Sequence, residues 1–222
     1  MNELPIDTLR RMAAKLSDED RDEMAIPSYL HKNPALRWMA WRRLHVTASR
    51  LAEVCEGRDR TRTTLLDYGC GTGVLLAEEL KHATTVIGVD LVLAASRLLV
   101  EEQHLTGVTL LTPDEAHVKV APNSVDIIVA AEVLEHVEPL EPTLLQMREW
   151  LVPGGRLVIS VPTEGRAYRF GRRLAGFHGH YHHANAASID RAIDKAGYRR
   201  LSKSTVPAPG PLAIYWVLVY EP

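Results

Sequence analysis

The chain has 222 residues, of which 46% are hydrophobic and 24% charged, and its formal net charge is −2. This length fits one domain, or one domain with an elaborated cap. A net charge so close to zero creates no positive field over the molecule, which argues against a nucleic acid partner. No run of about 18 uncharged apolar residues predicts a transmembrane helix.

The cysteine content and the first residues bear on the cellular compartment. Two cysteines, Cys55 and Cys70, are too few for a disulfide framework. The opening segment MNELPIDTLRRMAAKL is charged and lacks the apolar core of a signal peptide. We therefore expect a cytoplasmic protein.

Residues 1–60 are expected to form a helical cap. Ile6–Leu16 has the pattern of a short amphipathic helix, and Ala35–Val54 has that of a longer one. Four arginines of the longer segment lie mostly off its apolar stripe: Arg37, Arg42, Arg43 and Arg50. Aromatic and basic residues also gather near its start, and for these we favour packing over contact with a substrate: Tyr29, His31, Arg37 and Trp41.

The most informative segment is LLDYGCGTG, which runs from Leu65 to Gly73. Three glycines follow Asp67 at every second position: Gly69, Gly71 and Gly73. Glycine is needed where the backbone takes a positive φ or approaches a ligand closely, and the start of the next helix offers unpaired N–H groups. The pattern predicts a strand, a tight turn and a helix that bind a nucleotide-like molecule. Asp67 favours a ligand with positive charge over a pyrophosphate.

A second acidic residue follows the next apolar run, TVIGVDL, which ends in Asp90 and Leu91. A carboxylate at the tip of the second strand can accept hydrogen bonds from both ribose hydroxyls, as in dinucleotide-binding sheets. The glycine spacing, however, is G-x-G-x-G and not the G-x-G-x-x-G of pyrophosphate binders.

The central part of the chain alternates strand and helix patterns, which predicts a parallel sheet with helices on both faces. The expected strands are Thr64–Tyr68, Thr85–Asp90, Val108–Leu111, Ile127–Ala131 and Arg156–Val161. The expected helices between them are Leu75–Lys81, Leu93–Gln103 and Leu140–Leu151. In the tail we expect a helix at Ser188–Ala196 and two apolar segments, Arg199–Val206 and Ile214–Tyr220.

Together these motifs resemble the class I S-adenosylmethionine (SAM)-dependent methyltransferases. Besides the glycine turn and Asp90, three segments continue the match in order: DEAHVKVAPNSVD from Asp114, DIIVAAEVLEHV from Asp126 and LVPGGRLVISVP from Leu151. The resemblance covers residues 63–162. It implies a Rossmann-like, doubly wound α/β fold with a seven-stranded, mostly parallel sheet, an antiparallel C-terminal hairpin and a helical N-terminal cap.

The resemblance also implies a division of the chain and a set of cofactor contacts. Residues 61–222 would form the SAM-binding domain, and about 163–185 would form a lid over the substrate. The implied cofactor-binding residues are Asp67, Gly69, Gly71, Gly73, Asp90, Leu91, Asp114, Glu115 and Glu132. Asp114 would accept the adenine amino group, and Glu132 would lie where such sheets face cofactor and acceptor. No protein metal site is expected.

Histidines are the candidate bases, because imidazole titrates near neutral pH. Four lie close together in the lid segment, namely His178, His180, His182 and His183, and His136 follows the fourth expected strand. We take His180, His183 and His136 as catalytic candidates. A solvated histidine-rich loop, metal binding by HGHYHH, and a purely structural His136 stay open as alternatives.

The lid segment also carries a basic and aromatic run with three interpretations. A surface helix with solvated arginines, a clamp for an anionic acceptor and an interfacial helix that contacts lipid all fit it. The residues are Arg166, Tyr168, Arg169, Phe170, Arg172, Arg173 and Phe177. The protein is expected to be a monomer or a homodimer.

The sequence thus predicts a SAM-dependent methyltransferase that acts on a small-molecule or biosynthetic-intermediate acceptor, by O- or N-methylation. Two alternatives are an NAD(P)-dependent oxidoreductase on a Rossmann sheet and a SAM-binding protein without catalysis. A nucleic acid acceptor is not expected, because the end of the fourth strand reads AAEV and lacks the Asn/Asp-Pro-Pro-aromatic signature that orients a base amine.

Overall fold

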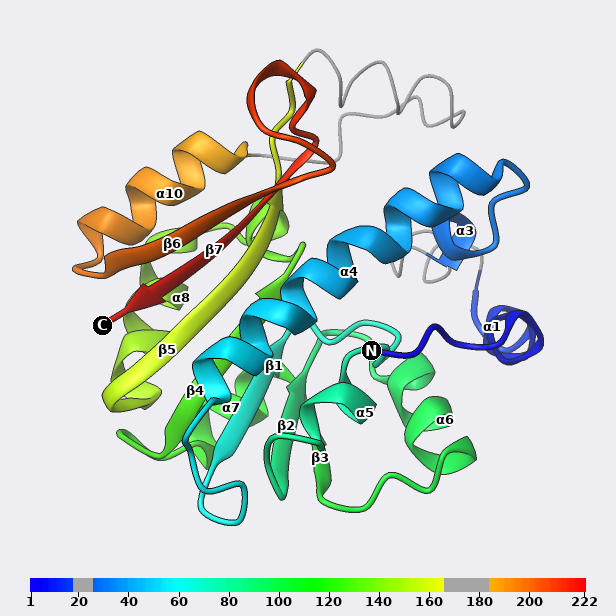
Figure 1. The fold of residues 1–222 in the computed structure, drawn as a ribbon. Helices are drawn as coiled ribbons and strands as arrows, with labels where there is room; N and C mark the ends of the chain where they lie inside the picture. The colour runs from blue at the N-terminus through cyan, green and yellow to red at the C-terminus, as the bar shows by residue number, and fades with distance from the viewer. Residues whose placement is uncertain (18–25, 166–183) are drawn as a thin grey trace.

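The structure is a computed structural model that describes residues 1–17, 26–165 and 184–222. A seven-stranded sheet crosses the molecule in the order β3-β2-β1-β4-β5-β7-β6 (Figure 1). The strands are β1 (Thr64–Tyr68), β2 (Thr85–Val89), β3 (Val108–Leu111), β4 (Val125–Ala131), β5 (Leu151–Pro162), β6 (Arg199–Val206) and β7 (Tyr215–Glu221). Neighbours from β3 to β5 pair in parallel, and β7 runs antiparallel to both β5 and β6. This confirms the expected fold class.

Helices lie on both faces of the sheet (Figure 1). The α-helices are α1 (Ile6–Ala14), α3 (Ile26–Tyr29), α4 (Pro34–Cys55), α5 (Leu76–Glu79), α6 (Ala94–Glu102), α7 (Pro113–Lys119), α8 (Leu140–Trp150) and α10 (Ala186–Lys195). Two 3₁₀ turns, η1 (Leu134–His136) and η2 (Gly210–Leu212), follow β4 and β6. None of the helices in the described ranges is long and apolar enough to cross a membrane.

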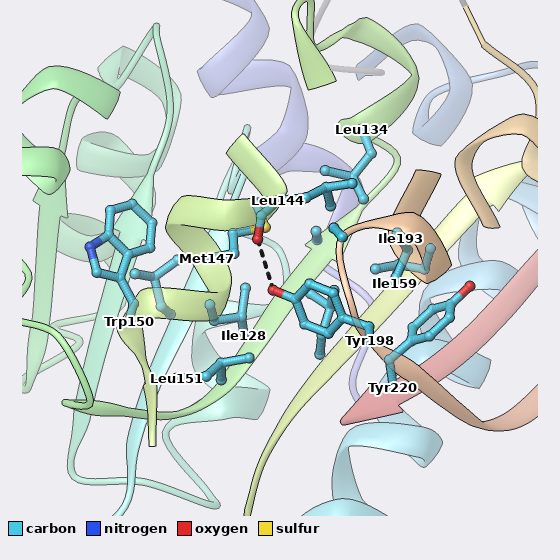
Figure 2. Close-up of a cluster of buried hydrophobic side chains, with 14 of the residues drawn as sticks. Ile128, Leu134, Leu144, Met147, Trp150, Leu151, Ile159, Ile193, Tyr198 and Tyr220 are labelled. Carbon is cyan, nitrogen blue, oxygen red and sulfur yellow. Dashed lines mark hydrogen bonds between the residues drawn. The ribbon is translucent and has the colours of Figure 1, made fainter. Parts of the chain in front are cut away.

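Alternation along the strands divides the core between the two faces. Leu66, Ile128 and Ile159 face the side covered by α7, α8 and α10, whereas their neighbours Leu65 and Ile127 face α4 and α5. This is the period of two that a strand buried on both faces requires. Figure 2 shows the first side, where Met147 and Trp150 of α8 pack on the sheet and the Tyr198 hydroxyl donates to the Leu144 carbonyl at 3.0 Å.

Several element boundaries differ from those the sequence predicted. Helix α7 was not expected, although Thr112 and Glu115 form a capping box and Pro113 stands at its first position. Strand β5 begins at Leu151, because the Pro-Gly-Gly segment continues the strand instead of preceding it. Helix α5 keeps only four residues of the expected Leu75–Lys81, and α1 ends at Ala14, two residues short of the predicted end.

Helix α4 connects the N-terminal region to the sheet. It begins after Asn33, whose side chain accepts from the Ala35 N–H, and it packs on β4, β5, β6 and β7. The expectation that Arg43 lies off the apolar stripe was wrong, since Arg43 is only 6% exposed. Tyr29 and Trp41 pack against each other, with ring centroids 4.7 Å apart, as favoured from the sequence. The division at residue 60 stays a prediction.

Candidate functional site

The glycine turn between β1 and α5 has the backbone that its sequence predicts. Gly69, Gly71 and Gly73 have φ values of +77°, +51° and +78°, a region that other residues rarely adopt. The N–H groups of Gly69 and Cys70 both donate to the Val89 carbonyl, at 2.7 and 3.1 Å, so the turn is fastened to the end of β2.

The three glycines meet different surroundings. A Cβ on Gly69 would lie 2.4 Å from Val133, which follows β4, so only glycine fits there. A Cβ on Gly73 would lie 2.9 Å from Leu76. At Gly71 a Cβ would meet nothing within 4 Å. The backbone of Gly71 is therefore open, as it must be if a ligand is to approach it.

Asp90 stands at the tip of β2 and holds the same turn. Its Oδ2 atom accepts from the Gly71 N–H at 2.7 Å, and its Oδ1 atom accepts from the Val92 N–H at 3.1 Å. These two bonds fix the orientation of the carboxylate. Each oxygen has a second lone pair for a further hydrogen bond.

Asp67, at the end of β1, is more deeply buried than its position next to the glycine turn led us to expect. It is 1% exposed, and its Oδ1 atom has no hydrogen-bond partner within residues 1–17, 26–165 and 184–222. Burial, with a smaller contribution from the Asp90 charge, raises the pKa of Asp67 to about 7. A charge on Asp67 is thus costly in this protein and would be stabilised by a cation nearby.

Three further predicted cofactor-binding residues separate into two kinds. Leu91 is 82% exposed beside Asp90, and Asp114 is exposed in the first turn of α7. Glu115, by contrast, is engaged locally: its carboxylate accepts from the Thr112 N–H at 3.0 Å and from Lys119 at 2.7 Å. The Lys119 and Thr112 bonds hold the pKa of Glu115 down at about 2. Helix capping accounts for Glu115 without a ligand.

Glu132 follows β4 and pairs with a residue that the sequence analysis placed in solvent. Its Oε1 atom lies 2.6 Å from Nε of Arg43, and the Glu132 N–H donates to the Ser160 carbonyl at 2.8 Å. Glu132 has a φ of +56°, which costs about 1–3 kcal/mol for a residue other than glycine. The ion pair and the backbone hydrogen bond hold this strained position.

Two tyrosines complete the surroundings of Arg43. Its Nη1 atom donates to the Tyr215 hydroxyl at 3.1 Å, and its guanidinium lies 5.3 Å from the Tyr215 ring and 5.9 Å from the Tyr29 ring. Burial raises the pKa of Tyr215 to about 12 despite the nearby arginine. Neither Arg43 nor Tyr215 was predicted as a site residue. Arg43 and the exposed Arg42 are adjacent arginines, and no local signal in the sequence distinguishes the buried one.

Glu135, in η1, is a second buried acid at this edge. It is 1% exposed, and in the described part of the chain its Oε2 atom has no hydrogen-bond partner. Burial, together with the Glu132 charge, raises its pKa well above the usual range. The neighbouring residue His136 is exposed. The catalytic candidates His180 and His183 lie outside the described residues, as do the basic and aromatic residues 166–177.

A family model described as "Methyltransferase domain" matches residues 31–203, which is most of the chain. The ubiquinone biosynthesis O-methyltransferase of Azoarcus sp. (strain BH72) is 34% identical over 110 residues, which make up 48% of this chain and 47% of the relative. The enzyme of the same name from Schizosaccharomyces pombe, a mitochondrial one, is 28% identical over 159 residues, or 65% of this chain and 58% of the relative. The chain spans about half the length of these curated relatives.

Solved structures share the fold. N-methyltransferase NodS from Bradyrhizobium japonicum WM9, in complex with S-adenosyl-L-homocysteine, is similar with a TM-score of 0.63 at 16% identity, covering 96% of this chain and 97% of that one. The 1,6-didemethyltoxoflavin-N1-methyltransferase of Burkholderia thailandensis has a TM-score of 0.63 at 16% identity, covering 99% and 91%. With the family match and the sheet order, these likenesses identify the chain as a member of the methyltransferase domain family, within the class I SAM-dependent methyltransferases.

Proposed function

We propose that the chain binds SAM at the carboxyl ends of β1, β2 and β4 and transfers its methyl group to a small-molecule acceptor. The observation that carries this proposal is the Asp90 carboxylate. It accepts a hydrogen bond from the Gly71 N–H of the glycine turn, and each of its oxygens has a further lone pair that can accept from a ribose hydroxyl.

The residues around Asp90 fit this cofactor. The space beside Gly71 admits a ligand against the backbone. Asp67 would offset the positive charge of the methionine portion. Leu91, which is 82% exposed, would cover the adenine, and Asp114 would accept its amino group. Glu115 contributes by fixing the first turn of α7, which carries Asp114.

The acceptor would lie beyond the methionine end of the cofactor, against the wall that Glu132, Arg43 and Tyr215 form. A buried ion pair flanked by phenol rings suits a polar aromatic or similarly compact molecule better than a long charged polymer. Among the relatives reported above are O-methyltransferases of ubiquinone biosynthesis and N-methyltransferases. A hydroxyl or an amine is accordingly the proposed reacting group.

Methyl transfer from a sulfonium is an in-line displacement, and the cofactor supplies the methyl group. The protein holds the acceptor atom about 3–3.5 Å away and removes its proton where the acceptor is a hydroxyl or an ammonium. We assign proton removal to a histidine. His136 stands at the edge where β4 ends, and His180 and His183 belong to the segment proposed as the lid.

The strand order and direction in the sheet argue against the oxidoreductase alternative. A dinucleotide-binding sheet has six parallel strands in the order 3-2-1-4-5-6, whereas an antiparallel β7 lies here between β5 and β6. Isothermal titration with SAM, S-adenosylhomocysteine and NAD⁺ tests the cofactor. We expect binding of the first two only, and binding of NAD⁺ alone would refute the proposal.

Methyl transfer itself is tested with SAM carrying a labelled methyl group. The acceptor panel should pair hydroxylated aromatic compounds with their amine analogues, so that the reacting atom is identified together with the activity. Label in any of these products supports a small-molecule acceptor. Tight SAM binding without label transfer over the whole panel would favour the alternative of a SAM-binding protein without catalysis.

A further inference from the structure

Two buried carboxyl groups stand behind the glycine turn. Asp67 is 1% exposed at the end of β1, and Glu79 is fully buried at the end of α5. Among the residues that the structure describes, no hydrogen-bond partner reaches three of their carboxyl oxygens: Asp67 Oδ1, Glu79 Oε1 and Glu79 Oε2. Buried acceptors without donors are rare in proteins, and each costs free energy.

Over the described ranges of the chain, no cation compensates the two carboxyl groups, and neither Asp67 nor Glu79 takes part in an ion pair. The charges that act on the pair are acidic: Asp90 raises the pKa of Asp67, and Asp67 raises that of Glu79. The thiols of Cys55 and Cys70 and the phenol of Tyr29 lie near enough for one of these two acids to raise their pKa values. Two negative charges without a counter-charge are strongly disfavoured in such buried surroundings.

Resting on the proposed function, we propose that Glu79 is a positioning residue of the cofactor site: it carries a proton and donates it in a hydrogen bond to Asp67 Oδ1. One shared proton then supplies the missing donor to Asp67 and removes the charge from Glu79. Asp67 is left as the single carboxylate behind the turn, oriented toward the positively charged end of the cofactor.

The surroundings of the two residues support this assignment of the proton. Glu79 is fully buried, and among the described residues neither of its carboxyl oxygens has a hydrogen-bond partner, whereas Asp67 lacks a partner only at Oδ1. Burial raises the pKa of both groups. Glu79, the more completely isolated carboxyl group, is therefore the one to which we assign the proton. A cation bound near Asp67 would bring the raised pKa of Asp67 back toward its usual value and leave the Glu79 proton in place.

Two substitutions of Glu79 distinguish the effect of losing its hydrogen-bond donor from the effect of changing its size. Glu79→Gln keeps an N–H donor in nearly the same shape, whereas Glu79→Leu removes the donor and leaves an apolar group. We expect Glu79→Gln to bind SAM within about threefold of the wild type at pH 8, since one donor replaces another. Glu79→Leu should bind SAM about tenfold more weakly at pH 7, and its affinity should recover as the pH is raised, because Asp67 without a donor ionises at higher pH.

Titration calorimetry from pH 6 to pH 9 measures these affinities. Glu78→Gln is the matched control: Glu78 is the preceding residue of α5 and pairs with Lys81 and the N-terminal amine, so its pH profile for SAM should match that of the wild type. A folded Glu79→Leu variant with the wild-type affinity and pH profile would overturn the proposal.

An infrared difference spectrum gives a second readout that needs no SAM and no apolar variant. The spectrum of the wild type minus that of Glu79→Gln at pH 8 should contain the C=O stretch of a protonated carboxylic acid. Its absence would overturn the proposal even if Glu79→Leu fails to fold. If the wild type binds no SAM at all, the proposed function fails, and this spectrum alone decides whether Glu79 holds the proton.

Discussion

Nε of Arg43 lies 2.6 Å from Oε1 of Glu132, and both side chains are largely withdrawn from solvent. This pair joins α4, from the N-terminal region, to the turn that follows β4. Because Glu132 has a positive φ and the next residue, Val133, contacts the position of Gly69, the pair connects the wall of the proposed acceptor site to the glycine turn.

Removing one partner of this pair should destabilise the protein strongly. Arg43→Ala leaves a buried, uncompensated Glu132 carboxylate, for which the expected loss is about 3–5 kcal/mol in the free energy of unfolding, measured with urea. Arg42→Ala is the matched control, since Arg42 is exposed on the same helix, and it should change stability by less than about 0.5 kcal/mol. Adding Glu132→Gln to Arg43→Met should restore part of the loss. Equal effects of the two arginine substitutions would show that the ion pair is unimportant.

Replacing Asp90 should weaken SAM binding with little effect on folding. Asp90→Ala removes charge-assisted hydrogen bonds to the ribose, for which the expected cost is about 1.5–3 kcal/mol, or roughly 10- to 150-fold in dissociation constant. Titration calorimetry measures this loss, and Asp194→Asn on the exposed side of α10 serves as the control. Unchanged affinity in a folded Asp90→Ala protein would remove Asp90 from the cofactor site.

The open side of Gly71 provides a test of where the ligand approaches. Gly71→Ala should cost about 1–2 kcal/mol in stability from its positive φ and should abolish SAM binding, because the added methyl group would occupy the ligand's space. Gly154→Ala is the control. Gly154 also has a positive φ, +82°, and open space around it, but it lies near the start of β5, at the opposite end of that strand from the proposed site, so SAM affinity should be retained. Parallel losses of affinity in both variants would indicate a general effect of strain.

Asp67 should impose a pH dependence on stability. Its pKa is raised to about 7 by burial, so the native state binds more protons than the unfolded state from about pH 4 to pH 7. The free energy of unfolding therefore falls as the pH rises through this window, by at most about 1.4 kcal/mol per pH unit from this group, and the loss is complete above pH 7. Urea unfolding at several pH values should give a shallower slope for Asp67→Asn. An identical slope would place the ionisation of Asp67 outside this window.

Proton removal by histidine predicts a selective kinetic effect. If His136 is the base, His136→Ala should lower kcat by roughly 100-fold or more and leave the SAM dissociation constant near that of the wild type. The same measurement on His180→Ala and His183→Ala distinguishes the three candidates. A variant that loses SAM affinity and kcat together acts through folding or cofactor binding and not as a base.

The cofactor half of this molecule could be predicted from local sequence. The glycine turn, the strand pattern and Asp90 are encoded within short segments, because backbone conformation at positive φ and the alternation of strand side chains depend on neighbouring residues. The helix α7 was missed although its capping box and Pro113 are also local; the segment from Asp114 was interpreted for its acidic residue, and no helix was predicted there.

The sequence by itself therefore determined the fold class, and it predicted the acids of the proposed cofactor site. Tertiary structure alone decided that Arg43 is buried against Glu132 and that Glu79, with no hydrogen-bond partner among the described residues, is buried at the end of α5. A charged residue beside an apolar stripe has the same local pattern whether it meets water or a partner. Whether such a residue is solvated or paired depends on its distance from the end of a strand far away in the sequence. That distance is fixed only when α4 and α5 pack on the sheet.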